Sequence, residues 1–211
     1  MSLSRLNSQL PRLLPGALRR IPDENAVAVT FDDGPTGAGT MRMLEHCASL
    51  GMKATFFFSG EQVQRFPDAV REAAATGHCI ASHGWRHVSP LRLRGTEFVR
   101  DLRRSAEAIE CVTGRQPAWY RPPYGRMHPA QLRRAVTLGC RVVLWSLMPG
   151  DWYPAEPAAG VRRRLERLRG GDIIVLHERP GPQHRLMDIL SYLAEHCDRR
   201  GLSFHTLDKV T

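Results

Sequence analysis

Short apolar runs alternate with segments of helical periodicity along most of the chain. The runs are partly β-branched or aromatic and mostly apolar on both faces, a pattern typical of buried parallel strands. We expect strands at residues 26–31, 54–60, 78–84, 118–125, 141–147, 172–177 and 202–207. Between them, helices are predicted at residues 39–51, 66–77, 95–114, 128–139 and 183–201. Nearly all of these helical segments end in glycine, the usual residue at a helix C-terminus.

This alternation predicts the fold class. Repeated about seven times, it indicates an α/β protein whose parallel sheet is either closed into a (β/α) barrel or doubly wound. A chain of 211 residues without internal repeats or a long linker fits one domain. We place that domain at residues 23–211 and treat residues 1–22 as an N-terminal arm.

The arm combines leucines near helical spacing with interleaved arginines, and Pro11 and Pro15 interrupt any single helix. Two interpretations remain open: an arm that packs on the domain, and a weak interfacial contact with anionic lipid. A second basic segment, residues 161–170, keeps its apolar residues at helical spacing. We interpret its arginines as the solvated face of a helix.

Composition limits the partners and the compartment. The net charge of +9 raises nucleic acid as a partner, but no aromatic–basic groove motif accompanies it, so a nucleic-acid binder is the least favoured class. The five cysteines are scattered without a CxxC pair, which indicates reduced thiols. No run reaches the roughly 18 apolar residues that span a bilayer, and the N-terminus lacks the apolar core of a signal peptide. We therefore expect a cytoplasmic protein.

The chemically capable side chains gather where the predicted strands end. They are Asp32 and Asp33 after the first strand, His83 and His87 after the third, Arg121 and Tyr124 at the fourth, Asp151 and Trp152 after the fifth, and His177 at the sixth. In a (β/α) barrel the carboxyl ends of the strands share the face that carries the active site. Independent structural accidents would scatter over both ends, so this clustering predicts a catalytic face.

Two of these residues have metal-ligand spacing. His83 and His87 are four apart, one turn of a helix, so both imidazoles can face one point. A carboxylate from another strand end would complete a His₂Asp set with an open position, the pattern of a catalytic metal site. Zn²⁺ is the first expectation from these ligand types, and Co²⁺, Ni²⁺ and Mn²⁺ remain open.

Six motifs in a fixed order carry a resemblance to a known family. They are "TFDDGP", "KATFFFSG", "SHGWRH", "YRPPYG", "GDW" and "IIVLHE". With these motifs the chain resembles the NodB-homology polysaccharide deacetylases, carbohydrate esterase family 4, from about residue 26 to residue 207. The resemblance implies a distorted (β/α) barrel that hydrolyses the N-acetyl amide of an amino sugar with one metal ion and metal-activated water.

The resemblance also implies a role for each aspartate of the first motif. Asp32 would be the general base, paired with Arg121, and Asp33 would join His83 and His87 as the metal ligands. An amide is a poor electrophile, and a divalent metal both polarises its carbonyl and activates water. A Gly-Pro turn after the aspartates would allow both to point inward.

The remaining roles concern the leaving group and the groove. By the resemblance, His177 is the acid that protonates the departing amine, and Asp151 supports it. Tyr124 would donate its backbone N–H to the oxyanion. Trp152 would form a groove wall, and Trp152 and Trp85 are our candidates for stacking on a sugar ring.

The chain departs from the family pattern at two positions. Met148 stands where the first of two usual aspartates would fall, which leaves the detail of that loop open but not Asp151. Gly84 stands where the family prefers Ser or Thr. We expect this glycine to loosen the loop that carries His83 and His87.

We expect the substrate to be an N-acetylated amino sugar in a biosynthetic precursor, lipid-linked at the inner membrane face. Two alternatives remain: a relative that opens a cyclic amide, and a carbohydrate-binding relative without activity. Acetate release from N-acetylglucosamine oligomers separates the first alternative from a deacetylase. Intact Asp32, metal ligands and His177 argue against the second.

Overall fold

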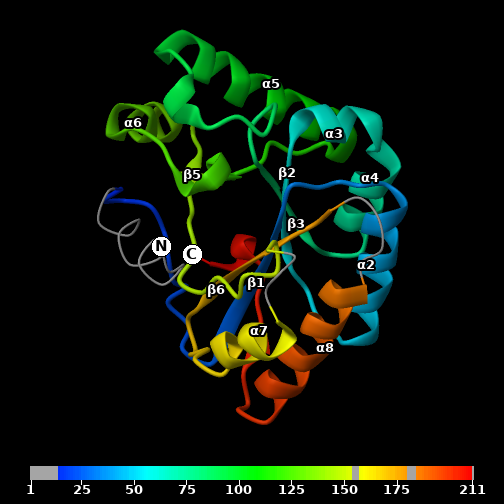
Figure 1. The fold of residues 1–211 in the computed structure, drawn as a ribbon. Coiled ribbons are helices and arrows are strands. Elements are labelled where there is room, and N and C mark those ends of the chain that lie inside the picture. The colour runs from blue at the N-terminus through cyan, green and yellow to red at the C-terminus, as the bar shows by residue number, and fades with distance from the viewer. Residues whose placement is uncertain (1–13, 154–156, 180–183, 211) are drawn as a thin grey trace.

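The computed structural model describes residues 14–153, 157–179 and 184–210. Its strands are β1 (Ala26–Asp32), β2 (Thr55–Phe58), β3 (Cys79–Ser82), β4 (Trp119–Tyr120), β5 (Arg141–Val142), β6 (Ile173–His177) and β7 (Ser203–Phe204). All pairings are parallel, in the order β5-β4-β3-β2-β1-β6, and β7 pairs with the first residues of β1. Figure 1 shows this curled sheet with its helices outside.

The sheet is closed between β5 and β6 by an irregular segment. The Leu147 N–H donates to the carbonyl of Ile173 at 3.1 Å, and the Leu147 carbonyl accepts from the Val175 N–H at 3.0 Å. A parallel bridge thus forms at Leu147 and Ile174, although β5 itself ends at Val142. The prediction of a distorted (β/α) barrel of about seven parallel strands is confirmed.

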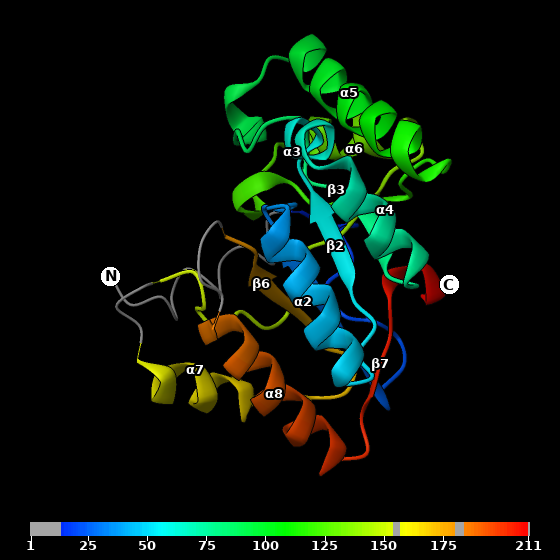
Figure 2. The same cartoon turned by 90° about the vertical axis from the view of Figure 1, so that its right-hand side faces the viewer.

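Helices cover the outer face of the sheet. They are α2 (Ala38–Ser49), α3 (Gly60–Arg65), α4 (Pro67–Ala75), α5 (Gly95–Thr113), α6 (Pro129–Thr137), α7 (Ala158–Leu165) and α8 (His184–Asp198), with 3₁₀ turns η2 (Pro90–Arg92), η3 (Pro123–Gly125) and η4 (Leu207–Lys209). Figure 2 shows α2 lying between α4 and α8, in front of β2 and β6. No helix among the described residues is long and apolar enough to cross a membrane.

Several predicted boundaries were wrong. The strand predicted at 118–125 is only two residues long, since Pro122 and Pro123 cannot donate to a sheet and η3 follows. The strand predicted at 54–60 ends at Phe58, and Gly60 opens the unpredicted helix α3. The helix expected at 161–170 is α7, which starts and ends earlier.

The apolar side of that basic segment is nonetheless as predicted. Val161, Leu165 and Leu168 are buried, while Arg162 and Arg163 are exposed. The segment is therefore amphipathic in the sense that its spacing predicted.

Side-chain alternation along β1 explains how the core leads into the candidate site. Ala26 and Ala28 belong to the cluster that includes Trp119 and Ile173, whereas Val27, Val29 and Phe31 belong to the layer beneath the helices. Because successive strand residues face opposite sides, the alanines share their face with Asp32. Trp119 and Arg121 are likewise two residues apart, and Ile173 and His177 are four apart, so each pair also shares one face. Three polar groups are thus brought to one end of the interior.

Part of the N-terminal arm lies within the described residues. Leu14 and Ile21 are buried in two different core clusters, and Leu18 forms a bridge to Val143. Residues 14–22 therefore pack on the barrel. The lipid contact was expected for the whole arm, residues 1–22, of which residues 1–13 lie outside the described residues. That contact and the domain boundary at residue 22 stay predictions.

Candidate active site and metal centre

Asp32 and Arg121 form a buried ion pair at the carboxyl end of the barrel. Arg121 Nη1 donates to Asp32 Oδ1 at 2.7 Å and to Thr30 Oγ1 at 2.6 Å, and Nη2 donates to the Leu144 carbonyl at 3.0 Å. The guanidinium lies over the Phe57 ring at 4.1 Å. Burial lowers the pKa of Arg121, and the charge and hydrogen bond of Asp32 oppose that shift. A carboxylate paired in this way is fixed in position, as a general base must be.

Asp33 turns away from the strand at its own backbone. Its φ is 77°, in the left-handed region that aspartate tolerates better than most residues. The sequence predicted that the turn at Gly34 and Pro35 would aim both aspartates inward; the reversal instead begins one residue earlier. The two neighbouring carboxylates can therefore approach one centre from different directions.

Asp33 lies against both histidines of the third motif. Its Oδ1 is 3.1 Å from His87 Nε2 and 3.5 Å from His83 Nε2. One ligand atom from each of the three residues lies within 4.8 Å of the others. Burial alone would raise the pKa of Asp33, but the hydrogen bonds and charges of His83 and His87 outweigh it and lower the pKa.

The segment from His83 to His87 is not helical, contrary to the spacing argument. It runs as a bend, with Gly84 at a φ of 83°. The two imidazoles still converge, with ring centroids 5.3 Å apart. The convergence comes from the bend and not from one turn of a helix.

The hydrogen bond of His83 tests whether this set fits a metal. Its Nδ1 lies 2.8 Å from the Arg121 carbonyl, which can only accept, so Nδ1 carries the hydrogen. In the neutral ring, Nε2 then turns its lone pair toward the anionic Asp33 Oδ1. Such a contact is unfavourable unless a proton on Nε2 or a metal cation lies between the two atoms. The residues present therefore fit a divalent cation, with the outer nitrogen of His83 held as in known metal sites.

A second, half-buried pair flanks the base. His177 Nδ1 lies 3.3 Å from both carboxylate oxygens of Asp151, and the His177 backbone N–H donates to Asp151 Oδ2 at 2.7 Å. Burial would lower the pKa of His177, but the hydrogen bond and charge of Asp151, with the charges of Asp32 and Asp33, raise it. His177 is paired in register with Asp32 across β1 and β6. An acid and a base thus stand on adjacent strands.

Tyr124 and Trp152 lie at the rim. Tyr124 has a φ of 61°, and its half-exposed ring lies 4.6 Å from the His87 ring. The role of the Tyr124 N–H as an oxyanion donor stays a prediction. Trp152 is half-buried and packs on Tyr153.

The prediction that Trp85 stacks on a sugar ring was wrong. Trp85 is only 5% exposed and belongs to the core, with the guanidinium of Arg104 over its ring at 3.7 Å. A Cβ atom added at Gly60 would lie 2.6 Å from the indole, so α3 covers its other side. The unpredicted helix α3 is what buries this tryptophan.

The expectation that Gly84 loosens the histidine loop does not match the contacts. The Trp85 N–H donates to Asp101 Oδ2 at 2.9 Å, and the Gly84 carbonyl accepts from the Gly60 N–H at 2.9 Å. A Cβ atom at Gly84 would lie 2.8 Å from Asp101 Oδ2. The loop is therefore held by α3 and α5, in a conformation that requires glycine. Met148, the other departure, is partly buried.

Two carboxylates near the site, the half-buried Asp101 and the buried Glu178, were missed by the sequence reasoning. Asp101 lies within α5, where nothing in the helical pattern distinguishes it from a surface residue. Glu178 follows His177 directly and is 1% exposed. An acidic residue immediately after a buried strand was an available signal, because the last motif includes it.

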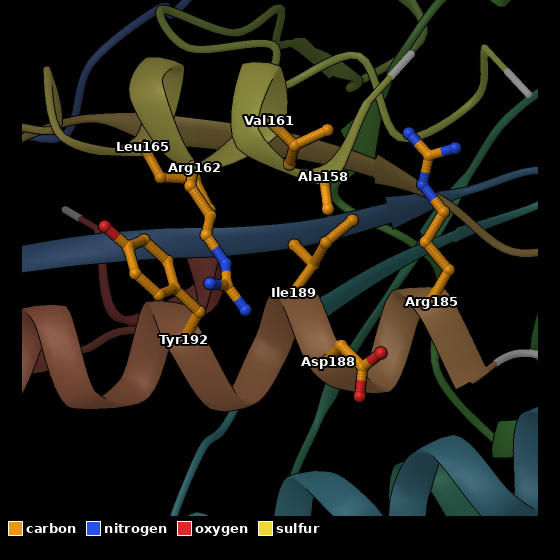
Figure 3. A pocket seen from close by; sticks show the side chains of 8 residues that line it. All are labelled: Ala158, Val161, Arg162, Leu165, Arg185, Asp188, Ile189 and Tyr192. Carbon is orange, nitrogen blue, oxygen red and sulfur yellow. The ribbon is translucent and has the colours of Figure 1, made fainter. Parts of the chain in front are cut away.

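A separate small cleft lies between α7 and α8 (Figure 3). Its volume is about 70 Å³, and it is lined by Ala158, Val161, Arg162, Leu165, Arg185, Asp188, Ile189 and Tyr192. Figure 3 shows Arg162 reaching toward Tyr192 on the facing helix, 5.2 Å from the ring centroid. None of these lining residues belongs to the predicted site.

The carboxyl end of the barrel thus brings together the Asp32–Arg121 pair, the Asp151–His177 pair and the Asp33, His83 and His87 set. The family model for polysaccharide deacetylase matches residues 19–143, more than half of the chain. The chain belongs to this family, and it is an N-deacetylase. The resemblance seen in the sequence is confirmed.

Relatives and solved structures agree with this assignment. A peptidoglycan-N-acetylglucosamine deacetylase of Bacillus cereus is 30% identical over 87% of this chain and 67% of its own length. A chitooligosaccharide deacetylase of Rhizobium leguminosarum is 32% identical over 74% of this chain and 73% of its own.

Two solved structures show the same fold over most of the chain. A peptidoglycan N-acetylglucosamine deacetylase has a TM-score of 0.87 at 28% identity, covering 96% of this chain and 95% of that chain. A family 4 carbohydrate esterase from Streptomyces lividans, in complex with acetate, has a TM-score of 0.80 at 27% identity, covering 88% and 94%.

Proposed function

We propose that this protein removes the N-acetyl group from an amino sugar of a glycan or glycan precursor, using one divalent metal ion held by Asp33, His83 and His87. The observation that carries the proposal is the convergence of Asp33 Oδ1 on His83 Nε2 at 3.5 Å and on His87 Nε2 at 3.1 Å, with one ligand atom from each residue within 4.8 Å of the others. Zn²⁺ suits a His₂Asp set with an open position, and Co²⁺, Ni²⁺ and Mn²⁺ are the other candidates.

The chain's own residues divide the proton transfers. A divalent metal in this site would polarise the acetyl carbonyl and make water a competent nucleophile near neutral pH. Asp32, held by Arg121, accepts the proton of that water. The Tyr124 N–H donates to the oxygen that becomes negatively charged as the carbonyl carbon turns tetrahedral.

His177 completes the reaction at the leaving group. An amine leaves only when protonated, and the Asp151 carboxylate favours the imidazolium that can supply this proton. Because Asp151 holds Nδ1, Nε2 is the nitrogen that donates. Asp32 and His177 thus hold base and acid roles from two adjacent strands.

The proposed substrate is an N-acetylated glycan. The relatives named above act on peptidoglycan and on chitooligosaccharides, and both contain N-acetylated amino sugars. The half-buried Trp152 at the rim supports a sugar-ring platform. The five cysteines are all unpaired in the structure, which supports a reducing compartment and hence a cytoplasmic precursor, lipid-linked at the inner membrane face.

An acetate-release screen tests this function. Chitin oligomers, peptidoglycan fragments, lipid-linked sugars and nucleotide sugars are offered to the metal-loaded protein, to protein stripped with a chelator, and to the stripped protein after Zn²⁺ is returned. We expect release from at least one glycan, loss on stripping and recovery on return. Full activity in metal-free protein would overturn the metal role. Hydrolysis of a cyclic amide with no acetate release from any glycan would overturn the substrate class.

A further inference from the structure

Glu178 lies just behind the candidate metal site, on the side away from the barrel interior. It is the first residue after β6, and its backbone N–H donates to the Asp32 carbonyl at 2.9 Å. Because His177 faces the interior, the next side chain along the chain faces the opposite way. The Glu178 carboxylate is thereby aimed at the start of α2, and its residue is 1% exposed.

One carboxylate oxygen of Glu178 collects three hydrogen bonds. Oε1 accepts from the Thr36 N–H at 2.9 Å, from Thr36 Oγ1 at 2.6 Å and from Thr40 Oγ1. The backbone of Glu178 thus holds residue 32, and its side chain holds residue 36. A single residue binds both ends of the turn that contains Asp33.

The other carboxylate oxygen of Glu178 packs closely against the middle of the same turn. A Cβ atom added at Gly34 would lie 2.2 Å from Glu178 Oε2, so the carboxylate occupies the space where any other residue would place its side chain. The Gly34 carbonyl is held in turn by the Ser59 N–H at 3.0 Å. The turn is therefore fixed at its first, middle and last residues.

This arrangement is not the one that stability alone favours. Oε2 is buried and has no hydrogen-bond partner among the described residues. An unpaired buried carboxylate oxygen destabilises the fold, and burial, with the nearby charge of Asp33, raises the pKa of Glu178. A buried polar group that is kept despite this cost indicates a positional role.

We propose that Glu178 is a positioning residue for the metal site: it clamps the turn of residues 32–36 and so holds the Asp33 carboxylate against His83 and His87. This inference rests on the proposed function, since it assigns Glu178 to the same metal centre. Loss of an outer residue that orients a ligand weakens metal binding by roughly 10–100-fold in known sites.

Asp172 provides a matched control on the same strand. It stands immediately before β6, as Glu178 stands immediately after, and it is 5% exposed. It accepts from Ser146 Oγ at 2.7 Å, from the Arg169 N–H at 2.7 Å and from Arg20. It is buried and hydrogen-bonded but lies at the far end of the barrel from Asp33. Asp172→Asn therefore reports what a lost carboxylate does to the fold alone.

The variants Glu178→Gln and Glu178→Asp separate shape from charge. Glutamine keeps an acceptor within reach of Thr36 and Thr40 but carries no charge. Aspartate keeps the charge but is one methylene too short to reach both threonines. If Glu178 acts as a clamp, Glu178→Gln should bind Zn²⁺ like the wild type, and Glu178→Asp should bind it as weakly as Glu178→Ala. A purely electrostatic contribution to metal binding requires the reverse order.

The experiment measures Zn²⁺ dissociation constants by competition with a chromophoric chelator, together with the melting temperature of the metal-free proteins. We expect Glu178→Ala and Glu178→Asp to bind Zn²⁺ about 10–100-fold more weakly, Glu178→Gln to stay within about 3-fold, and Asp172→Asn to melt earlier with unchanged affinity. If Glu178→Ala does not fold, the Asp and Gln variants decide. Unchanged Zn²⁺ affinity in both Glu178→Asp and Glu178→Ala would overturn the inference alone. Absence of Zn²⁺ binding by the wild-type protein would overturn the proposed function itself.

Discussion

His78 is buried and His177 is half-buried, and these two histidines at strand ends lie at opposite ends of the barrel in opposite electrostatic surroundings. His78 precedes β3, and its Nδ1 accepts from the Ala54 N–H at 3.1 Å. Burial and the charge of Lys53 lower its pKa to about 4. His177 ends β6, and although burial opposes it, Asp151 raises its pKa. Burial alone therefore does not decide the protonation of an imidazole; the charge built beside it does.

The wider surroundings of the two histidines differ in the same way. The amino end of the barrel holds paired groups such as Asp172, and a wide cavity of about 460 Å³ opens there beside His78 and Trp119. The carboxyl end holds the Asp32–Arg121 pair, the Asp33–His87 contact and the clamped turn. A histidine that stays neutral in the interior needs only one backbone hydrogen bond, as His78 has. A histidine that stays protonated needs a carboxylate beside it, as His177 has. We conclude that the amino end serves the fold and the carboxyl end serves the reaction.

The largest expected effect is a difference in the rate of acetate release between variants of the two histidines. His177→Ala removes the proton donor and should slow acetate release by roughly 10²–10⁴-fold. His78→Gln keeps an acceptor for the Ala54 N–H and should leave turnover per folded molecule within about 3-fold. Steady-state rates on one N-acetylated oligomer, corrected for folded fraction, make the test. Comparable losses in both variants would break the comparison between the two ends.

A smaller effect should follow from Asp151. Asp151→Asn removes one of the charges that raise the pKa of His177 against the effect of burial, so this pKa falls. The alkaline limb of the pH–rate profile should move to lower pH and the rate should drop, while bound metal measured by elemental analysis stays constant. Loss of metal instead would make Asp151 a ligand and contradict the assigned roles.

The two histidines should also make the free energy of unfolding depend on pH in opposite directions. Because the pKa of His78 is lowered to about 4, the unfolded chain binds its proton first as the pH falls below about 6.5. Its contribution of about 1–3 kcal/mol is present above that pH and is lost between about pH 6.5 and pH 4. His177, with its raised pKa, contributes stability below about pH 6.5 that is lost as the pH rises through its folded value.

Denaturant unfolding of metal-free protein from pH 4 to pH 8 measures these contributions. The difference between wild type and His78→Gln should shrink as the pH falls, and the difference between wild type and His177→Gln should shrink as it rises. Parallel pH dependences in the two variants would show that the neighbouring charges do not separate the sites.

The smallest expected effect concerns two tryptophans. Trp152 lies half-buried at the rim, whereas Trp119 is 2% exposed at the amino end. Trp152→Ala should raise KM for a glycan oligomer by about 2–10-fold with little change in kcat, as expected for one lost aromatic contact. Trp119→Phe should lower the melting temperature and leave KM unchanged. An unaltered KM in Trp152→Ala would remove this residue from the substrate groove.

The residues at the strand ends could be predicted well, because side chains alternate between the two faces of a strand and the apolar residues show which face is interior. Asp32, Arg121 and His177 are in phase with apolar interior residues, so their common location follows from alternation. The bend that carries His83 and His87 was taken for a helix, because spacing alone does not distinguish two conformations that both bring the side chains together. Trp85 was misplaced because its burial depends on α3, a helix of six residues that is too short to show a period.

Glu178 was missed for a related reason. Its out-of-phase position turns it away from the interior, and only the folded chain shows that residues 34, 36 and 40 surround it. Contacts between segments more than a hundred residues apart leave no local pattern. The first coordination sphere of such a site is thus easier to predict than the residues that support it.

The left-handed backbone at Asp33 narrows the sequence space open to evolution at this position. A residue here must adopt a φ of 77° and also present a short anionic oxygen donor. Glycine adopts this backbone conformation but has no side-chain oxygen, and asparagine tolerates it but carries no negative charge. Glutamate and histidine are longer, and they adopt left-handed backbone less readily than aspartate or asparagine. Few substitutions at this position therefore keep both the left-handed backbone and the anionic oxygen, and a descendant that lost the aspartate would keep the path of the chain only with a residue that tolerates a positive φ.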